Sequence, residues 1–166
     1  MIPAIEALAG QGRLLVVATG GAGTAELRAR YPRDDVLIED CVDFEQAFPH
    51  TQVYVTNGGL GGVLLALSHG VALLVAGMRE GKGDINARLA SRGLAVDLRT
   101  EKPSTRAIAR GAERVLGDAG MTERVAGVAA SLAALDSVEL VVRGILDRVP
   151  DSDPPRAHRP ADATAD

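Results

Sequence analysis

A loop of seven residues, Thr56–Gly62, has the composition of a phosphate-binding turn. It follows a β-branched apolar run and opens a helical pattern, so it joins a strand to a helix. Glycines let a ligand approach the backbone closely, and the first turn of a helix offers free N–H groups at the positive end of its dipole. Both features suit a diphosphate, although tight packing of the helix alone would also favour glycine. The candidate ligands are Asn57, Gly58, Gly59, Gly61 and Gly62.

Two further glycine loops follow strand-like runs. The loop Thr19–Thr24 contains Gly21-Ala22-Gly23, a partial dinucleotide-binding fingerprint, but Glu26 stands in the place of the third glycine. We therefore interpret this loop as an ordinary strand–helix turn and keep a NAD- or NADP-dependent oxidoreductase as an alternative. The loop Gly77–Asp84 places charged residues beside glycines. Its side chains would contact sugar hydroxyls or a phosphate, or would simply face solvent.

The remaining composition excludes several classes of function. The net charge of −4 and the aromatic content of 2% argue against nucleic-acid binding. The three histidines lack a spaced nucleophile or carboxylate, and no Cys/His cluster has metal-ligand spacing, so we expect neither a catalytic triad nor a metal site. The single cysteine, Cys41, is interpreted as a small buried residue. No apolar run reaches about 18 residues and no signal peptide is evident, so we expect a cytoplasmic protein without stable membrane insertion.

The elements that position these loops alternate between strands and helices. Short runs that are apolar on both faces suit parallel strands covered by helices, and the pattern predicts an open, doubly wound, mostly parallel α/β sheet of the Rossmann type. In such sheets, ligands bind beyond the carboxyl ends of the strands, where the glycine loops lie. The predicted strands are Leu14–Ala18, Val36–Ile38, Val53–Val55, Val71–Ala76 and Leu94–Val96.

After Pro103 the pattern is helical only. Ser104 and Asp136 are predicted to cap the first and third of three helices, and the second begins near Met121. We expect residues 1–148 to form one domain and residues 149–166, which are rich in Pro, Asp and Ala, to be a disordered tail. Each helix has a predicted apolar stripe. The stripes are Ile108, Ala112, Val115 and Leu116 on the first helix, Val125, Val128 and Leu132 on the second, and Val138, Val141, Val142 and Ile145 on the third.

The stretch VYVTNGGLGGVLLALSHGVALLV, residues 53–75, resembles the nucleotide-sugar-binding, C-terminal half of GT-B glycosyltransferases. The most similar group is the inverting family of UDP-glycosyltransferases and antibiotic or glycolipid glycosyltransferases. The resemblance runs from Met1 to about Arg148. It implies a Rossmann-like sheet followed by helices, a donor sugar linked to UDP or dTDP, and no cofactor.

The resemblance also implies roles for individual residues. Asn57 stands where most of the family has a His that contacts the donor diphosphate, and Gly62 stands where a Ser or Thr phosphate ligand is common. A bacterial branch that acts on lipids and natural products has Asn-Gly-Gly at the positions of residues 57–59 and Glu-Asp-Lys at the positions of residues 80–82. Glu80 and Lys82 match that branch, while Gly81 replaces its Asp. The resemblance implies that Asn57 donates a hydrogen bond to phosphate and that Lys82 supplies the positive charge that Asn57 lacks.

The nucleobase loop of the family aligns with Asp40–Phe44. Cys41 replaces its aromatic residue and Asp43 replaces its Pro, so we do not expect the stacking platform, while the resemblance implies backbone contacts of the nucleobase with Val42. A Glu that holds the ribose in the family is Leu65 here.

Two parts of the family's enzymes have no counterpart in this sequence. One is the acceptor-binding N-terminal domain with its catalytic His base, and the other is the first strand of the donor domain. In the family's strand order, 3-2-1-4-5-6, that strand separates the counterparts of Leu14–Ala18 and Val53–Val55. These two strands would then lack their shared neighbour. We assign no catalytic residue and expect the chain alone to be nearly inactive.

The leading hypothesis is the donor-binding part of a bacterial inverting glycosyltransferase that transfers a hexosyl group to a lipid or natural-product hydroxyl. One alternative is a non-catalytic nucleotide-binding subunit, completed by another chain that supplies the acceptor domain and the strand. Another is a non-functional remnant of a truncated gene.

Overall fold

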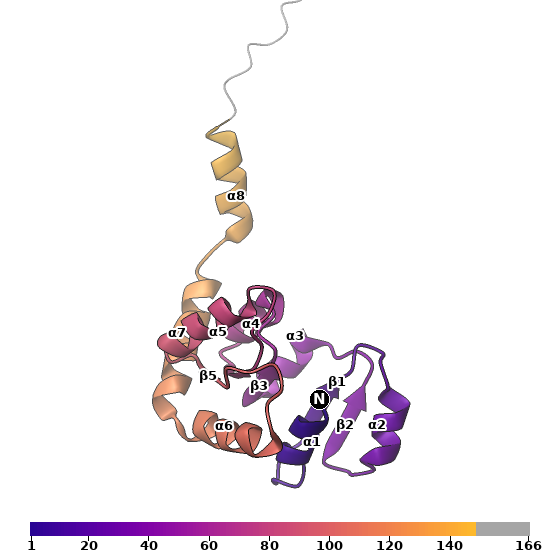
Figure 1. Cartoon of the computed structure of the whole chain (residues 1–166). Coiled ribbons are helices and arrows are strands. Elements are labelled where there is room, and N and C mark those ends of the chain that lie inside the picture. Colours follow the sequence, from indigo (N-terminus) through magenta and orange to yellow (C-terminus); the bar gives the residue numbers. More distant parts are fainter. Residues whose placement is uncertain (149–166) are drawn as a thin grey trace, which may run out of the picture. The chain divides into compact units, whose positions relative to one another are not determined.

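The two-sided apolar runs form parallel strands, as their composition predicts. The computed structural model describes residues 1–148, and all the strand pairs in this range are parallel (Figure 1). Each predicted strand is present, with its ends within one or two residues of the expected bounds. The strands are β1 (Leu15–Ala18), β2 (Val36–Glu39), β3 (Val53–Thr56), β4 (Ala72–Val75) and β5 (Ala95–Asp97).

Helices occupy the segments before, between and after the strands. The Ser104 hydroxyl accepts a hydrogen bond from the Ala107 N–H at 3.2 Å, and the Asp136 carboxylate accepts one from the Glu139 N–H at 2.9 Å, so both predicted caps are confirmed. The helices are α1 (Ile2–Leu8), α2 (Thr24–Arg30), α3 (Phe44–Ala47) with the 3₁₀ turn η1 (Phe48–His50), α4 (Leu60–Ser68), α5 (Lys82–Ser91), α6 (Thr105–Gly117), α7 (Ala119–Ala133) and α8 (Ser137–Leu146).

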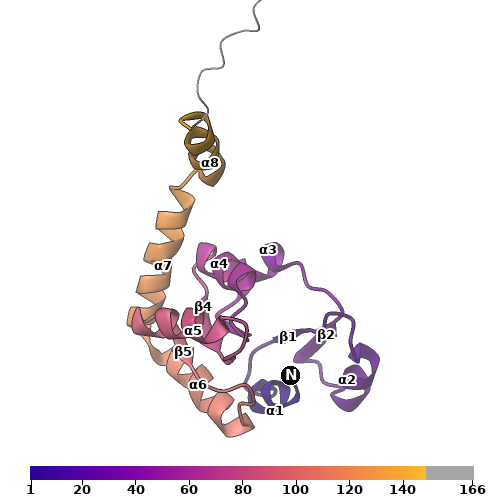
Figure 2. The same cartoon turned by 45° about the horizontal axis from the view of Figure 1, so that its top comes forward.

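Strand β4 is the centre of the larger core. Leu73, Leu74 and Val75 are 0% exposed, because β3 and β5 flank β4 and helices cover both faces of this sheet (Figure 1). Helix α6 packs closely on one face, since a Cβ at Gly111 would lie only 2.6 Å from Leu74 Cδ1. On the other side, α4 packs against both β4 and α7 (Figure 2). The carboxyl ends of β3 and β4 are thereby held on a rigid layer.

The strands form two separate sheets, β1–β2 and β3–β4–β5. Two hydrogen bonds show which edge of β1 faces β2. The Leu15 N–H donates to the Asp35 carbonyl, and the N–H of Thr19, the residue after β1, donates to the Glu39 carbonyl, both at 2.9 Å. Since peptide groups alternate in direction along a strand, those of Val16 and Ala18 point to the opposite edge. That edge of β1 has no strand partner within residues 1–148.

Strand β3 has a matching free edge. The Thr56 carbonyl accepts a hydrogen bond from the Ala76 N–H at 3.0 Å on the β4 side, so the peptide groups of Val53 and Val55 point away from β4. In the part of the chain that the structure describes, no strand pairs with this edge. The residues just before β1 and β3 do meet, because Arg13 Nε donates to Gln52 Oε1 at 3.0 Å.

Helix α1 connects the two sheets through its side chains. Its Ile5, 1% exposed, packs with Val17 and Ile38 of the smaller sheet, whereas Ala7 belongs to the larger core. The same helix packs against α6 (Figure 1). Apolar contacts at α1, and not a continuous sheet, therefore hold β1–β2 against the rest of this unit.

Some predictions differ from the structure. Cys41 is exposed, and its interpretation as a buried residue is wrong because the loop after β2 lies outside both apolar clusters. Leu116 is 37% exposed, because it lies beside the buried stripe of α6 and not in it. The stripe predicted near the C-terminus lies on α8, which buries none of its residues.

The chain divides by its contacts into two units, Met1–Ala133 and a second that begins at Ala134 and contains α8. The predicted domain boundary at residue 148 remains a prediction, and the predicted tail, residues 149–166, lies outside the described residues. No single helix within residues 1–148 has the length and apolar composition to cross a membrane, although α7 and α8 together pass that test.

The free strand edges predict a specific pattern of amide hydrogen exchange. The amides of Val16, Ala18, Val53 and Val55 should exchange at least about tenfold faster than those of β4, because they lack a strand partner. Residue-resolved exchange measured by NMR on the native chain tests this. Equal protection of β1, β3 and β4 would contradict the division into two sheets.

Candidate functional site

The loop between β3 and α4 is folded by hydrogen bonds to its own side chains. The Gly58 N–H donates to Thr56 Oγ1 at 3.3 Å, and the Gly59 N–H donates to Asn57 Oδ1 at 3.2 Å. Gly58 has a φ of +87°, a conformation that favours glycine. The Asn57 amide oxygen is therefore engaged within the loop, and its amino group makes no hydrogen bond within residues 1–148.

The first turn of α4 offers several unpaired N–H groups. Its first helical hydrogen bond runs from the Val63 N–H to the Gly59 carbonyl at 3.0 Å, which leaves the N–H groups of Leu60, Gly61 and Gly62 without helical partners. In the described part of the chain no side chain caps this end of the helix, and no acidic residue lies in its first turn. These donors and the helix dipole together attract an anion.

The four glycines of this loop have different explanations. A Cβ at Gly58 would collide with Asn86 Oδ1, and a Cβ at Gly62 would lie 3.1 Å from Tyr54 Oη, so packing accounts for these two. A Cβ at Gly61 would have no atom within 4 Å, and a Cβ at Gly59 would meet only Asn57 Oδ1 at 3.7 Å, an ordinary contact. Helix packing alone therefore does not explain Gly59 and Gly61, and Gly61 faces open space.

A buried asparagine joins this loop to the next one. Asn86 of α5 is 0% exposed, and its Nδ2 donates to the Gly77 carbonyl at 3.0 Å, while its Oδ1 has no hydrogen-bond partner among residues 1–148. The two loops also touch through their backbones, since a Cβ at Gly77 would collide with the Asn57 carbonyl oxygen. Sequence reasoning missed Asn86, although its place on the buried side of α5 with Leu89 was a usable signal.

The loop between β4 and α5 carries the other predicted ligands. Lys82 is the first residue of α5, and its ammonium group pairs with the Glu80 carboxylate. Glu101, a residue that sequence reasoning did not select, accepts hydrogen bonds from the N–H groups of Met78 at 2.5 Å and Arg79 at 2.8 Å. These two hydrogen bonds hold the pKa of Glu101 below its ordinary value. Glu101 thus fixes the start of this loop.

The predicted nucleobase loop follows β2, in the smaller sheet. Val42 is half-buried, and the Asp43 carboxylate caps α3 by accepting hydrogen bonds from the N–H groups of Glu45 and Gln46 at 3.1 and 3.3 Å. The residue that replaces the family's Pro therefore has a structural role of its own. The structure brings Asn57 and Gly58–Gly62 together with Gly77, whereas Val42 lies on a separate element.

The loop after β1 is closed by side-chain hydrogen bonds within the loop and to the loop after β2. The Thr24 hydroxyl lies 2.6 Å from Thr19 Oγ1 and also bonds the Asp40 carboxylate. Gly20, Gly21 and Gly23 all have positive φ angles, so turn geometry explains them. This arrangement supports the interpretation as an ordinary strand–helix turn.

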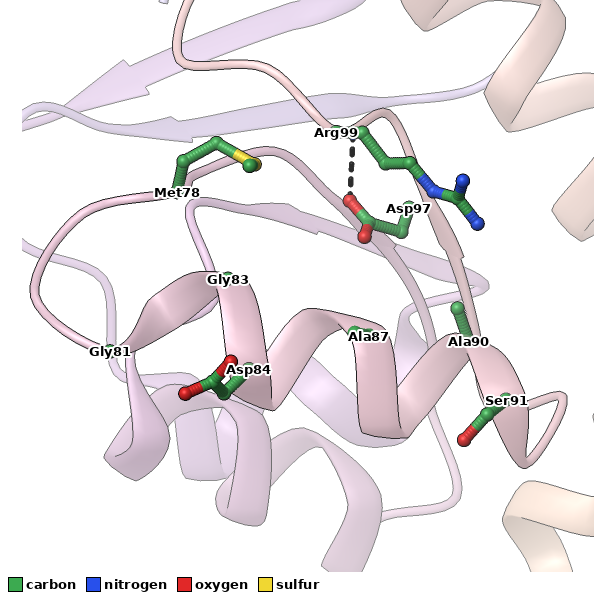
Figure 3. A pocket seen from close by; sticks show the side chains of 9 residues that line it. All are labelled: Met78, Gly81, Gly83, Asp84, Ala87, Ala90, Ser91, Asp97 and Arg99. Atoms are coloured by element: carbon green, nitrogen blue, oxygen red, sulfur yellow. Dashed lines mark hydrogen bonds between the residues drawn. The ribbon is translucent and has the colours of Figure 1, made fainter.

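A depression of about 620 Å³ lies between α5 and the loop after β5 (Figure 3). The small residues Gly83, Ala87 and Ala90 form its α5 side, and on the opposite side the Asp97 carboxylate accepts a hydrogen bond from the Arg99 N–H at 2.8 Å. None of residues 57–62 lines it, so it is distinct from the first turn of α4. Nowhere in residues 1–148 do three His, Cys, Asp or Glu side chains gather in a way that could hold a metal ion.

Comparison with known proteins identifies relatives over most of the chain. No protein-family model matches it. It is similar to 4'-demethylrebeccamycin synthase from Lentzea aerocolonigenes, with 36% identity over 138 residues, covering 83% of this chain and 32% of that protein. It is also similar to UDP-glucosyltransferase 1 from Beauveria bassiana, with 31% identity over 144 residues, covering 84% of this chain and 31% of that protein. The chain thus spans about a third of the length of these curated relatives.

Solved glycosyltransferase structures share the fold. The glycotransferase of kitacinnamycin superposes with a TM-score of 0.80 at 21% identity, covering 90% of this chain and 39% of that one. The glycosyltransferase VinC in complex with dTDP superposes with a TM-score of 0.76 at 20% identity, covering 87% of this chain and 36% of that one. The chain belongs to the UDP-glycosyltransferase family, and its fold is that of the C-terminal, Rossmann-like half of a GT-B glycosyltransferase.

Proposed function

We propose that this chain is the donor-binding part of an inverting glycosyltransferase and holds the diphosphate of a nucleotide sugar at the first turn of α4. One observation carries the proposal: three unpaired N–H groups surround Gly61, which faces open space and which packing does not explain. An oxygen-rich anion can therefore approach that backbone without a steric barrier.

The other predicted ligands extend this site. The free amino group of Asn57 adds a neutral donor to the diphosphate, and Lys82, which pairs with Glu80 at the neighbouring loop, adds a positive charge. The backbone at Val42 contacts the nucleobase. In sugar transfer, the N–H groups of α4 stabilise the negative charge that develops on the departing diphosphate. We assign no catalytic base to this chain.

The names of relatives indicate the substrate class. VinC is solved in complex with dTDP, and the relative from Beauveria bassiana is a UDP-glucosyltransferase, so we infer a UDP- or dTDP-linked hexose as donor. The relative named 4'-demethylrebeccamycin synthase supports a natural product as the acceptor. We further propose that the acceptor group is a lipid or natural-product hydroxyl and that the enzyme is bacterial and cytoplasmic.

A second candidate function is a nucleotide-binding subunit that another polypeptide completes. The free edges of β1 and β3 favour it, because peptide groups at both edges lack partners within residues 1–148. In this role the partner supplies a strand between them and the acceptor domain. Sugar transfer to an acceptor by the purified 166-residue chain alone would contradict this candidate.

Calorimetric titration of the purified chain with UDP and dTDP tests the proposed donor site. We expect saturable binding of at least one of them, with NAD and NADP showing none. Absence of binding at millimolar UDP and dTDP would reject both binding functions and favour a non-functional remnant. Specific binding of NAD or NADP would instead revive the oxidoreductase alternative.

Gly61→Ala separates binding from folding. The methyl group meets no protein atom, so we expect the free energy of unfolding to rise by about 0.4–1 kcal/mol, while UDP affinity falls by about tenfold because the methyl group obstructs the phosphate. Urea unfolding and calorimetry measure the two effects.

Gly127→Ala is the matched control for this variant. Gly127 also lies in a helix, α7, and a Cβ there would have no atom within 4 Å. It should gain similar stability without a change in UDP affinity. Unaltered UDP binding by Gly61→Ala would show that the ligand does not approach that backbone.

Glu101→Gln tests how the β4–α5 loop is fixed. Because the folded-state pKa of Glu101 is lowered from its ordinary value of 4.5, the carboxylate contributes stability above that pH and loses it as the pH falls through the lowered pKa. The wild-type Tm should exceed that of Glu101→Gln near neutral pH, and the difference should vanish in acid. An equal difference at both pH values would assign the effect to packing.

A further inference from the structure

We propose that the hydroxyl group of Tyr54 is an additional ligand of the donor's diphosphate. This inference rests on the proposed function of the α4 turn and adds a residue that neither the glycine pattern nor the predicted ligands include. It derives from an unpaired hydroxyl that the fold places against the same turn of the helix.

The tip of the Tyr54 ring lies against Gly62. A Cβ at Gly62 would lie 3.1 Å from Tyr54 Oη, 3.5 Å from Cε1 and 3.7 Å from Cζ. Gly62 is the third residue of α4, and its N–H is one of the groups without a helical partner. The phenolic oxygen is thus adjacent to the turn that the diphosphate would occupy.

The Tyr54 hydroxyl forms no hydrogen bond with any residue of the described chain, whereas the other tyrosine does form one. Tyr31 Oη donates to Glu6 Oε1 at 3.3 Å. The Tyr54 side chain is half-buried and its oxygen remains accessible to solvent, so a ligand can reach it. At the first turn of α4 the neighbouring groups are themselves donors, the N–H groups of Leu60, Gly61 and Gly62. Several donors without acceptors at one place fit a ligand with several acceptor oxygens, as a diphosphate has.

Aromatic packing fixes the position of this hydroxyl. Tyr54 of β3 makes edge contacts with Phe48, at a ring-centroid distance of 5.0 Å, and with Phe44, at 5.7 Å, and those two rings stack at 5.2 Å. Three of the four Phe and Tyr residues in the chain are in this cluster. A ring held in this way presents its oxygen with little loss of side-chain entropy on binding.

The absence of a side chain at Gly62 makes the arrangement sterically possible. A contact of 3.1 Å is shorter than most real contacts of a Cβ, so any larger residue at position 62 would push the phenol away from the helix. Because Gly62 has no side chain, the hydroxyl of Tyr54 on β3 can lie against the first turn of α4.

Tyr54→Phe tests the proposal in the full chain, because it removes one oxygen atom and breaks no hydrogen bond within the described residues. We expect the Kd for UDP and for inorganic diphosphate to rise by about tenfold, since the lost hydrogen bond is to a charged oxygen. Uridine, which lacks phosphate, should bind as it does to the wild type, and the Tm should not change.

Tyr31→Phe is the matched control, since it also removes a phenolic oxygen, and it should leave UDP affinity unchanged. In the double variant Tyr54→Phe/Gly62→Ser, the serine supplies a hydroxyl on the same turn of α4. This variant should recover part of the UDP affinity that Tyr54→Phe loses.

The outcomes distinguish this inference from the proposed function. If the wild type binds UDP and Tyr54→Phe binds it equally well, the Tyr54 proposal is wrong and the α4 site stands. An equal loss of uridine and UDP affinity would also overturn the proposal, because it would place the hydroxyl at the nucleoside. If the wild type binds neither UDP nor diphosphate, both fail together.

Discussion

The site depends on a direct backbone contact between two loops. The Cα of Gly77 lies against the carbonyl group of Asn57, and Asn86 closes the contact from beneath, with its amide between Gly58 and the Gly77 carbonyl. Side chains larger than hydrogen at Gly58 or Gly77 would separate the loops. Every other donor group of the proposed site, on α4 and at the start of α5, is positioned relative to this contact.

The buried Asn86 lowers the free energy of unfolding. Its Oδ1 is inaccessible to solvent and has no partner within residues 1–148, and an unsatisfied buried polar atom costs about 1–3 kcal/mol. A residue of similar size with an apolar side chain would avoid that cost but would leave the Gly77 carbonyl unpaired in turn. The amide therefore connects the loops at the expense of stability, a trade that is common at binding sites.

Much of the fold follows from local pattern. Runs such as Val53–Val55 are apolar on both faces and short, which specifies parallel strands between helix layers, and Ser104 and Asp136 cap their helices through contacts only three residues away. The glycine loop of α4 is likewise visible because strand, glycines and helix are contiguous.

The residues that sequence reasoning missed act over longer separations. Glu101 binds N–H groups of residues more than twenty positions earlier, and Tyr54 meets α4 only after β3 and the helix pack together. Cys41 was misjudged for a related reason: a small apolar residue beside a strand is buried only where another element covers it. Periodicity reports which face of one element is apolar, not which element covers that face.

The free edges of β1 and β3 also bear on how the chain behaves in concentrated solution. Unpaired N–H and C=O groups along an open strand form hydrogen bonds with any extended peptide that meets them, and β1 carries no charged residue to discourage this. Such edges favour association between molecules, and the extent of association rises with protein concentration. The open edges of β1 and β3 on neighbouring copies of the chain are the strands that such an edge meets most often in a concentrated solution. We therefore expect dilute solutions of this chain to be the least aggregated.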